Sequence, residues 1–180
     1  MIHDLDVVLA FVNSPVRSVD AVGIPVLSET EDIANARLRF ENGCVANLTA
    51  SRVSAERMRK IRVFSAGPAT SYVSLDYRAQ EGFIYRIARD GEEESSLLKK
   101  LLAARDSTIV SEFGGKRIVR EPVPIEKEEP LKLELQSFIR CITEKQSPLV
   151  SGESAKQALD LAVEISRQIQ SQPPSPPPLS

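Results

Sequence analysis

The fold of this chain is decided by residues 33–51, which read IANARLRFENGCVANLTAS. Apolar and polar side chains alternate on both sides of Asn42-Gly43, with the two-residue period of a half-buried strand. Asn-Gly supplies the two positive-φ residues of a two-residue type I′ turn, so the stretch predicts a β-hairpin. One apolar and one polar face are typical of an antiparallel sheet covered on one side only. The predicted apolar face is Ala34, Ala36, Leu38, Phe40, Ala46, Leu48 and Ala50.

An apolar helix precedes the hairpin. Its apolar residues recur at helical spacing up to Val12, and Pro15 prevents the helix from continuing. The apolar residues are Ile2, Leu5, Val8, Leu9 and Val12. Two strand-like stretches follow between Val16 and about Val26, separated by Gly23-Ile24-Pro25.

Further strands are expected after the hairpin, and the last third of the chain is helical. Alternation predicts strands over residues 60–64, 71–77, 83–88 and 117–125, the last at a sheet edge because of Pro122 and Pro124. Leucines at helical spacing predict a short helix over residues 95–104, and a mobile excursion over residues 89–115 is the alternative. A helix is expected from Pro130, and another after Ser151 as N-cap. The buried face of this last helix would be Ala155, Ala158, Leu159, Ala162, Ile165 and Ile169.

Together these elements predict an α+β fold, a mainly antiparallel open sheet with helices packed on one face. Residues 1–172 would form one domain, a length that suits a single hydrophobic core. Residues 173–180 read PPSPPPLS, and such a proline-rich tail is expected to be extended and disordered.

The composition argues against several classes of protein. A net charge of -2 disfavours nucleic acid as the main partner, because phosphate binding needs a basic excess. The two cysteines, Cys44 and Cys141, are far apart, which favours reduced thiols in the cytoplasm. No apolar run approaches the roughly 20 residues of a membrane span, and we expect no secretory signal. One histidine and no carboxylate pair at ligand spacing argue against a transition-metal site.

The single histidine, His3, lies in the first turn of the predicted first helix. Asp6 follows three residues later, so both side chains share one helix face, where the carboxylate could orient the imidazole ring. An imidazole exchanges protons near neutral pH, which suits a proton-transfer step in catalysis. The alternative interpretation is an exposed histidine near the chain end that has no role.

Basic residues are concentrated directly after the hairpin. Residues 52–62 contain five bases and one acid, Glu56; the bases are Arg52, Arg57, Arg59, Lys60 and Arg62. Arginine binds diphosphate oxygens in a bidentate manner, which would fit a ligand that carries a diphosphate. We expect Arg52, Asn47, Arg59 and Lys60 to bind substrate. Arg52 is the main candidate because it ends the strand that would line the pocket. A solvated strand edge with ordinary ion pairs is the alternative.

The order of several short motifs resembles a known family. The motifs are HDLD (3–6), DIANAR (32–37), ENG (41–43), TASR (49–52), RKIR (59–62), ELQSF (134–138), Pro148 and SGE (151–153). This series resembles the C-terminal domain of the glucose–fructose oxidoreductase, inositol dehydrogenase and MocA family. Within the family the resemblance is to its UDP-N-acetylglucosamine 3-dehydrogenase-like, sugar-nucleotide members.

The resemblance implies a Rossmann domain that binds NAD or NADP, joined to the domain that holds the substrate. The sequence contains no Gly-x-Gly-x-x-Gly loop and no Glu-Lys-Pro motif, so we expect the Rossmann domain to be missing. The family's aspartate four residues before the histidine would fall upstream of Met1. Of the family's acid–base groups His3 remains as the candidate catalytic residue, and the chain alone should be inactive.

Two functions therefore stay open. The first is the substrate-binding half of an NAD(P)-dependent sugar or sugar-nucleotide dehydrogenase, with a pocket on the polar sheet face beside His3. The second is a non-catalytic ligand-binding or dimerisation module with a broad, flat open-sheet interface. In both cases we expect a homo-oligomer formed through the open sheet face. The exact substrate and the choice between NAD and NADP are left open.

Overall fold

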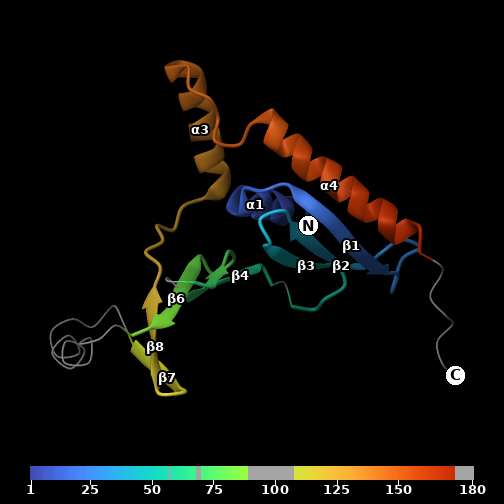
Figure 1. Cartoon of the computed structure of the whole chain (residues 1–180). Coiled ribbons are helices and arrows are strands. Elements are labelled where there is room, and N and C mark those ends of the chain that lie inside the picture. The colour runs from blue at the N-terminus through green and yellow to red at the C-terminus, as the bar shows by residue number, and fades with distance from the viewer. Residues whose placement is uncertain (57, 68–69, 89–107, 173–180) are drawn as a thin grey trace, which may run out of the picture. The chain divides into compact units, whose positions relative to one another are not determined.

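The computed structural model describes residues 1–56, 58–67, 70–88 and 108–172 (Figure 1). Within these residues, three helices and two antiparallel sheets confirm the predicted α+β class, with two open sheets in place of the single expected one. Residue contacts divide the chain into two compact units, Met1–Ala55 with Glu134–Ser180, and Glu56–Leu133. The helix expected over residues 95–104 and the tail 173–180 lie outside the described residues.

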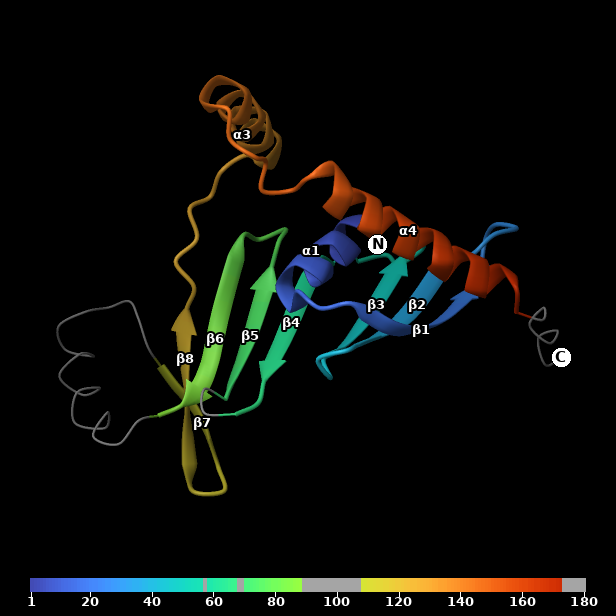
Figure 2. The ribbon, with the colours of Figure 1, turned by 45° about the horizontal axis from the view of Figure 1, so that its top comes forward.

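The first unit contains a three-stranded sheet with strand order β1-β2-β3. Helix α1 (Ile2–Val12) precedes β1 (Val16–Ile24), β2 (Ile33–Phe40) and β3 (Val45–Ser51), and α4 (Gly152–Gln170) follows late in the chain. Both α1 and α4 lie on one face of this sheet, as Figure 2 shows. The prediction of helices on one face is therefore confirmed for this unit.

The hydrophobic core of the first unit lies between this sheet and the two helices. The side chains of Leu5 on α1 and Leu38 on β2 are fully buried. Leu38 is paired with Val19 on β1 and Ala46 on β3, so it occupies the centre of the sheet. Apolar residues of β2 are buried and the polar residues between them are exposed, which confirms the predicted faces of the hairpin.

The turn between β2 and β3 differs from the prediction. Phe40 N–H donates to the carbonyl of Cys44 and Gly43 N–H donates to the carbonyl of Phe40, so the loop has three residues. Within it Gly43 has a positive φ of 86° and Asn42 does not. The predicted two-residue type I′ turn is therefore wrong, and a type I turn ending in a left-handed glycine takes its place. Asn42 Nδ2 donates to the carbonyl of Val12, which ties the turn to the end of α1.

Strand β1 is continuous, where two separate stretches were predicted. Pro25 ends it, and Gly23 lies within it because α4 passes close by. A Cβ at position 23 would lie 2.5 Å from Cγ2 of Ile169, so only glycine fits without a shift of that side chain.

The second unit is a five-stranded antiparallel sheet with strand order β4-β5-β6-β8-β7. Its strands are β4 (Lys60–Ser65), β5 (Ser71–Asp76), β6 (Glu81–Ile87), β7 (Thr108–Phe113) and β8 (Lys116–Pro122). The predicted strands 60–64, 71–77 and 83–88 agree with β4, β5 and β6 to within two residues. The predicted edge position of the last strand is wrong, because β8 lies between β6 and the unpredicted β7. Pro122 is tolerated as the final residue of β8.

The C-terminal helices begin as predicted. Helix α3 (Pro130–Glu144) starts at Pro130, and the Oγ of Ser151 accepts a hydrogen bond from Ser154 N–H at 3.2 Å as the N-cap of α4. The predicted buried face of α4 is partly wrong, since Leu159 is half exposed and Leu161 is buried. None of the helices in the described part of the chain combines the length and apolar character needed to cross a membrane.

Candidate functional site

His3 lies in the first turn of α1 with its side chain exposed to solvent. Leu5, two residues later, is fully buried in the core, so its packing holds the helix turn that carries His3 in place. Asp6 is half-buried, and within the described residues it forms no hydrogen bond with His3. The carboxylate of Asp4 lies 3.2 Å from the Met1 nitrogen instead. The structure thus presents His3 as an accessible imidazole on a fixed helix turn.

The connectivity of the first unit places His3 and Arg52 toward the same end of the sheet. The end of α1 is held against the β2–β3 turn, where Glu41 N–H donates to the carbonyl of Pro15. The first turn of α1 therefore points toward the opposite end, where β3 finishes and leads into Arg52 (Figure 2).

The guanidinium of Arg52 is held by the loop between β1 and β2. Its Nε donates to Oδ1 of Asp32 at 2.6 Å. Its Nη2 donates to Thr30 Oγ1 at 2.8 Å, Glu31 O at 2.7 Å and Ser28 Oγ at 3.0 Å. Within the described residues, Nη1 has no hydrogen-bond partner, and the side chain is 56% exposed. Only the Nη1 edge of Arg52 is thus available to a ligand without breaking these contacts.

Asp32, which holds Arg52, was not predicted as a functional residue. Its carboxylate is almost fully buried and receives backbone N–H donors from the β1–β2 loop. Backbone donors leave no trace in residue types, so the sequence signal was limited to an acidic residue directly before a strand.

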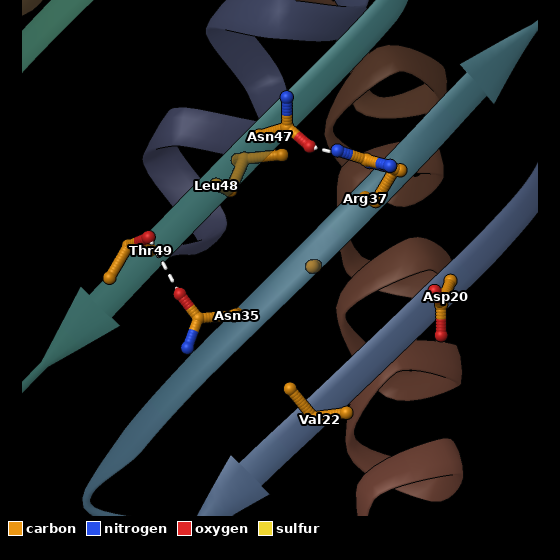
Figure 3. A pocket seen from close by; sticks show the side chains of 8 residues that line it. Asp20, Val22, Asn35, Arg37, Asn47, Leu48 and Thr49 are labelled. Carbon is orange, nitrogen blue, oxygen red and sulfur yellow. Dashed lines mark hydrogen bonds between the residues drawn. The ribbon is translucent and has the colours of Figure 1, made fainter.

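Asn47 lies on the open face of the sheet, away from the helices. Figure 3 shows it beside Arg37, whose Nε donates to its Oδ1 at 2.8 Å. On the neighbouring row, Thr49 donates to Asn35 at 2.7 Å. These side chains border a shallow pocket of about 200 Å³ on the open face. The pocket is lined by Asp20, Val22, Asn35, Ala36, Arg37, Asn47, Leu48 and Thr49. Because α1 packs on the other face, Asn47 does not share a face with His3.

The other two candidate substrate ligands belong to the second unit. Lys60 begins β4, and its ammonium lies 3.3 Å from a carboxylate oxygen of Asp76. The N–H of Ala79 and this ammonium hold the pKa of Asp76 below its usual range. Arg59 directly precedes β4 and is exposed. Arg57, the remaining base between Arg52 and Arg59, lies outside the described residues.

A row of stacked aromatic rings crosses the second sheet. The rings of Phe64 and Tyr72 lie 4.6 Å apart, and those of Tyr72 and Tyr85 lie 5.0 Å apart. These residues are cross-strand partners on β4, β5 and β6. The sequence alone does not reveal this row, because it depends on the pairing register of three strands. Among the described residues there is no group of three histidine, cysteine or carboxylate side chains that could hold a metal ion.

Comparisons with known proteins agree with this architecture. Residues 1–67 match the family model of the GFO/IDH/MocA C-terminal domain. UDP-N-acetylglucosamine 3-dehydrogenase from Acidithiobacillus ferrooxidans is 28% identical over 165 residues, which is 92% of this chain and 45% of that protein. A solved structure of this relative superposes with a TM-score of 0.73 and 26% identity, covering 95% of this chain and 46% of the other.

A more distant structure shares the fold. The WlbA dehydrogenase from Bordetella pertussis, solved in complex with NADH and UDP-GlcNAcA, has a TM-score of 0.51 at 18% identity, covering 99% of this chain and 44% of that one. This chain therefore spans less than half the length of the relatives it matches. The predicted resemblance is confirmed: the chain is similar to the GFO/IDH/MocA C-terminal domain, whose family model matches residues 1–67.

Proposed function

We propose that this chain supplies the substrate-binding half of an NAD(P)-dependent dehydrogenase that oxidises a hydroxyl of a sugar or sugar nucleotide. A UDP-linked N-acetyl sugar, oxidised at C3, is the favoured substrate. The similarity to UDP-N-acetylglucosamine 3-dehydrogenase over 95% of the chain carries this proposal. The exposed imidazole of His3 on an anchored helix turn supports it, because the oxidation needs a group that accepts the hydroxyl proton.

The described residues divide into two roles in this proposal. His3 accepts the proton of the reacting hydroxyl. Asp6 lies on the same helix face without a hydrogen bond to the imidazole among the described residues, and it stays a candidate for orienting the ring once the imidazole is charged. Arg52 binds the diphosphate through its Nη1 edge, since its other two nitrogens are held by the loop. Arg59 and Lys60 belong to the second unit, and their role in substrate binding stays a prediction. Asn47 lies with Arg37 on the open face of the sheet, so it is not part of the site around His3.

The dinucleotide does not fit the residues of this chain. The 180 residues contain no Gly-x-Gly-x-x-Gly sequence, and such a loop is what cradles the pyrophosphate in a Rossmann domain. NAD or NADP would be bound by a dinucleotide-binding domain outside these residues. The chain alone is therefore expected to bind substrate without catalysing its oxidation.

Titration calorimetry on the 180-residue chain tests this division of roles. We expect heat of binding with UDP-N-acetylglucosamine and none with NAD or NADP, because the chain carries diphosphate-binding arginine but no phosphate-cradling loop. Micromolar binding of either dinucleotide would show that the cofactor site lies in this chain. No binding of the nucleotide sugar at millimolar concentration would remove the substrate-binding role.

A second function is favoured by the open face of the first sheet. Three apolar side chains on this face are about half exposed: Val22, Ile24 and Val45. No described helix covers them, because α1 and α4 pack on the opposite face. A sheet face of this kind suits pairing with a second copy of the chain, which would make it a dimerisation module.

Sedimentation velocity at tens of micromolar tests this self-association. We expect a dimer or larger species, since a standard-size interface is populated in that range. Val22→Glu should shift the population toward monomer by placing a charge on the open face. Val163→Glu, at a similarly exposed position on α4, is the matched control and should change nothing. A clean monomer for the unmodified chain would argue against the interface.

A further inference from the structure

The carboxylate of Asp32 is the centre of a buried hydrogen-bond cluster. Its Oδ2 accepts from the N–H groups of Val26, Leu27 and Ser28 at 2.8, 2.6 and 2.9 Å. Its Oδ1 accepts from Nε of Arg52 and from Oγ of Ser28. Three consecutive backbone N–H groups aimed at one oxygen form an anion-binding concavity, and the protein's own carboxylate fills it.

The charge of this carboxylate is maintained by its surroundings. The N–H groups of Leu27 and Val26 hold the pKa of the Asp32 carboxyl well below its usual range. A lowered pKa in the folded state stabilises the fold above about pH 4, and this contribution is lost as the pH falls further. At neutral pH the carboxylate is therefore a permanent negative partner for Arg52.

The loop between β1 and β2 also binds a second nitrogen of the Arg52 guanidinium, Nη2. Thr30 Oγ1 and the carbonyl of Glu31 accept from Nη2, the nitrogen next to the one bound by Asp32. A planar guanidinium held at two nitrogens has a fixed orientation, so the direction of Nη1 is fixed as well. Arginine that is already ordered loses less side-chain entropy when it binds an anion.

We propose that Asp32 is a positioning residue: it locks the 26–28 backbone and the guanidinium of Arg52 into one rigid element that presents Nη1 to the substrate diphosphate. This inference rests on the proposed function and adds to it a residue that does not itself contact the substrate. Asp32 acts through Arg52, because its own oxygens are used inside the cluster.

The affinities of the chain for UDP and for uridine measure this effect, because the two ligands differ by the diphosphate. Arg52→Gln should reduce the preference for UDP about tenfold, the scale of one charge-assisted hydrogen bond. Asp32→Asn should reduce it to a similar extent. An asparagine oxygen still accepts from the 26–28 backbone, whereas its amide group no longer accepts from Nε of Arg52.

The double variant separates positioning from a general structural role. If Asp32 acts through Arg52, adding Asp32→Asn to Arg52→Gln causes no further loss of the UDP preference. Asp160→Asn, which removes an exposed ion pair with Lys156 on α4, is the control and should leave the preference unchanged. The inference would be overturned if the double variant lost more of the UDP preference than Arg52→Gln alone. An unchanged UDP preference in Asp32→Asn would overturn it as well.

Two further outcomes are distinguishable. An unmodified chain that binds UDP no better than uridine would overturn both the diphosphate role in the proposed function and this inference. If the Asp32→Asn variant does not fold, Thr30→Val is tested in its place. Thr30→Val removes one contact of Arg52 Nη2 without disturbing the buried carboxylate of Asp32. A smaller but measurable loss of UDP preference is then expected, and no loss would overturn the inference.

Discussion

Replacing His3 with alanine should lower the turnover number about 100-fold in a polypeptide that joins this domain to a dinucleotide-binding domain, the usual scale for losing a general base. His3 is the only histidine in the chain, and its side chain is exposed on a helix turn that Leu5 anchors in the core. The substitution removes the proposed proton acceptor without touching the core. Steady-state rates of dinucleotide reduction across neutral pH measure the effect.

Asp4→Asn is the matched control for this prediction. Asp4 lies on the same helix turn, but among the described residues its carboxylate forms no hydrogen bond with the imidazole. We expect the control to retain most of its turnover. Full turnover of the His3→Ala variant throughout neutral pH would show that the proton is accepted by another group.

Replacing Leu38 with alanine should destabilise the first unit by about 2–5 kcal/mol, the range for a leucine deleted from a packed core. Leu38 is fully buried at the centre of the sheet, between cross-strand partners on β1 and β3. The loss combines lost burial of apolar surface with the cavity that remains. Urea unfolding followed by circular dichroism gives the free energy of unfolding.

Leu149→Ala is the matched substitution at an exposed position. Leu149 is 96% exposed, so its replacement should change the free energy of unfolding by less than about 0.5 kcal/mol. Equal effects at the two positions would mean that the core of the first unit is not built around Leu38.

Much of the fold could be predicted because burial follows local periodicity. The alternation on β2 and β3 predicted which face is buried, since a period of two residues allows only one choice once a face is apolar. The turn type was not predictable from Asn42-Gly43, because Asn42 is held by the carbonyl of Val12 from the end of α1. The edge prediction for β8 was wrong because its neighbour, β7, shows no clear strand pattern in the sequence.

The candidate site was predictable only in part. The sequence indicated His3 and Arg52, because an isolated histidine and a basic cluster are visible in residue types alone. The contacts that hold Arg52 were not visible, since they come from backbone atoms and from residues 20 or more positions away. The same limitation applies to Asn47, whose face depends on where α1 packs.

We propose that this domain binds a nucleotide sugar for oxidation. The most direct measurement compares the rates at which the joined polypeptide reduces NAD or NADP with UDP-N-acetylglucosamine and with free N-acetylglucosamine. We expect reduction with the UDP-linked sugar and a much lower rate with the free sugar, because the free sugar offers Arg52 no diphosphate to bind. Equal rates with both sugars would contradict the diphosphate role, and no reduction with either would contradict the proposed function itself.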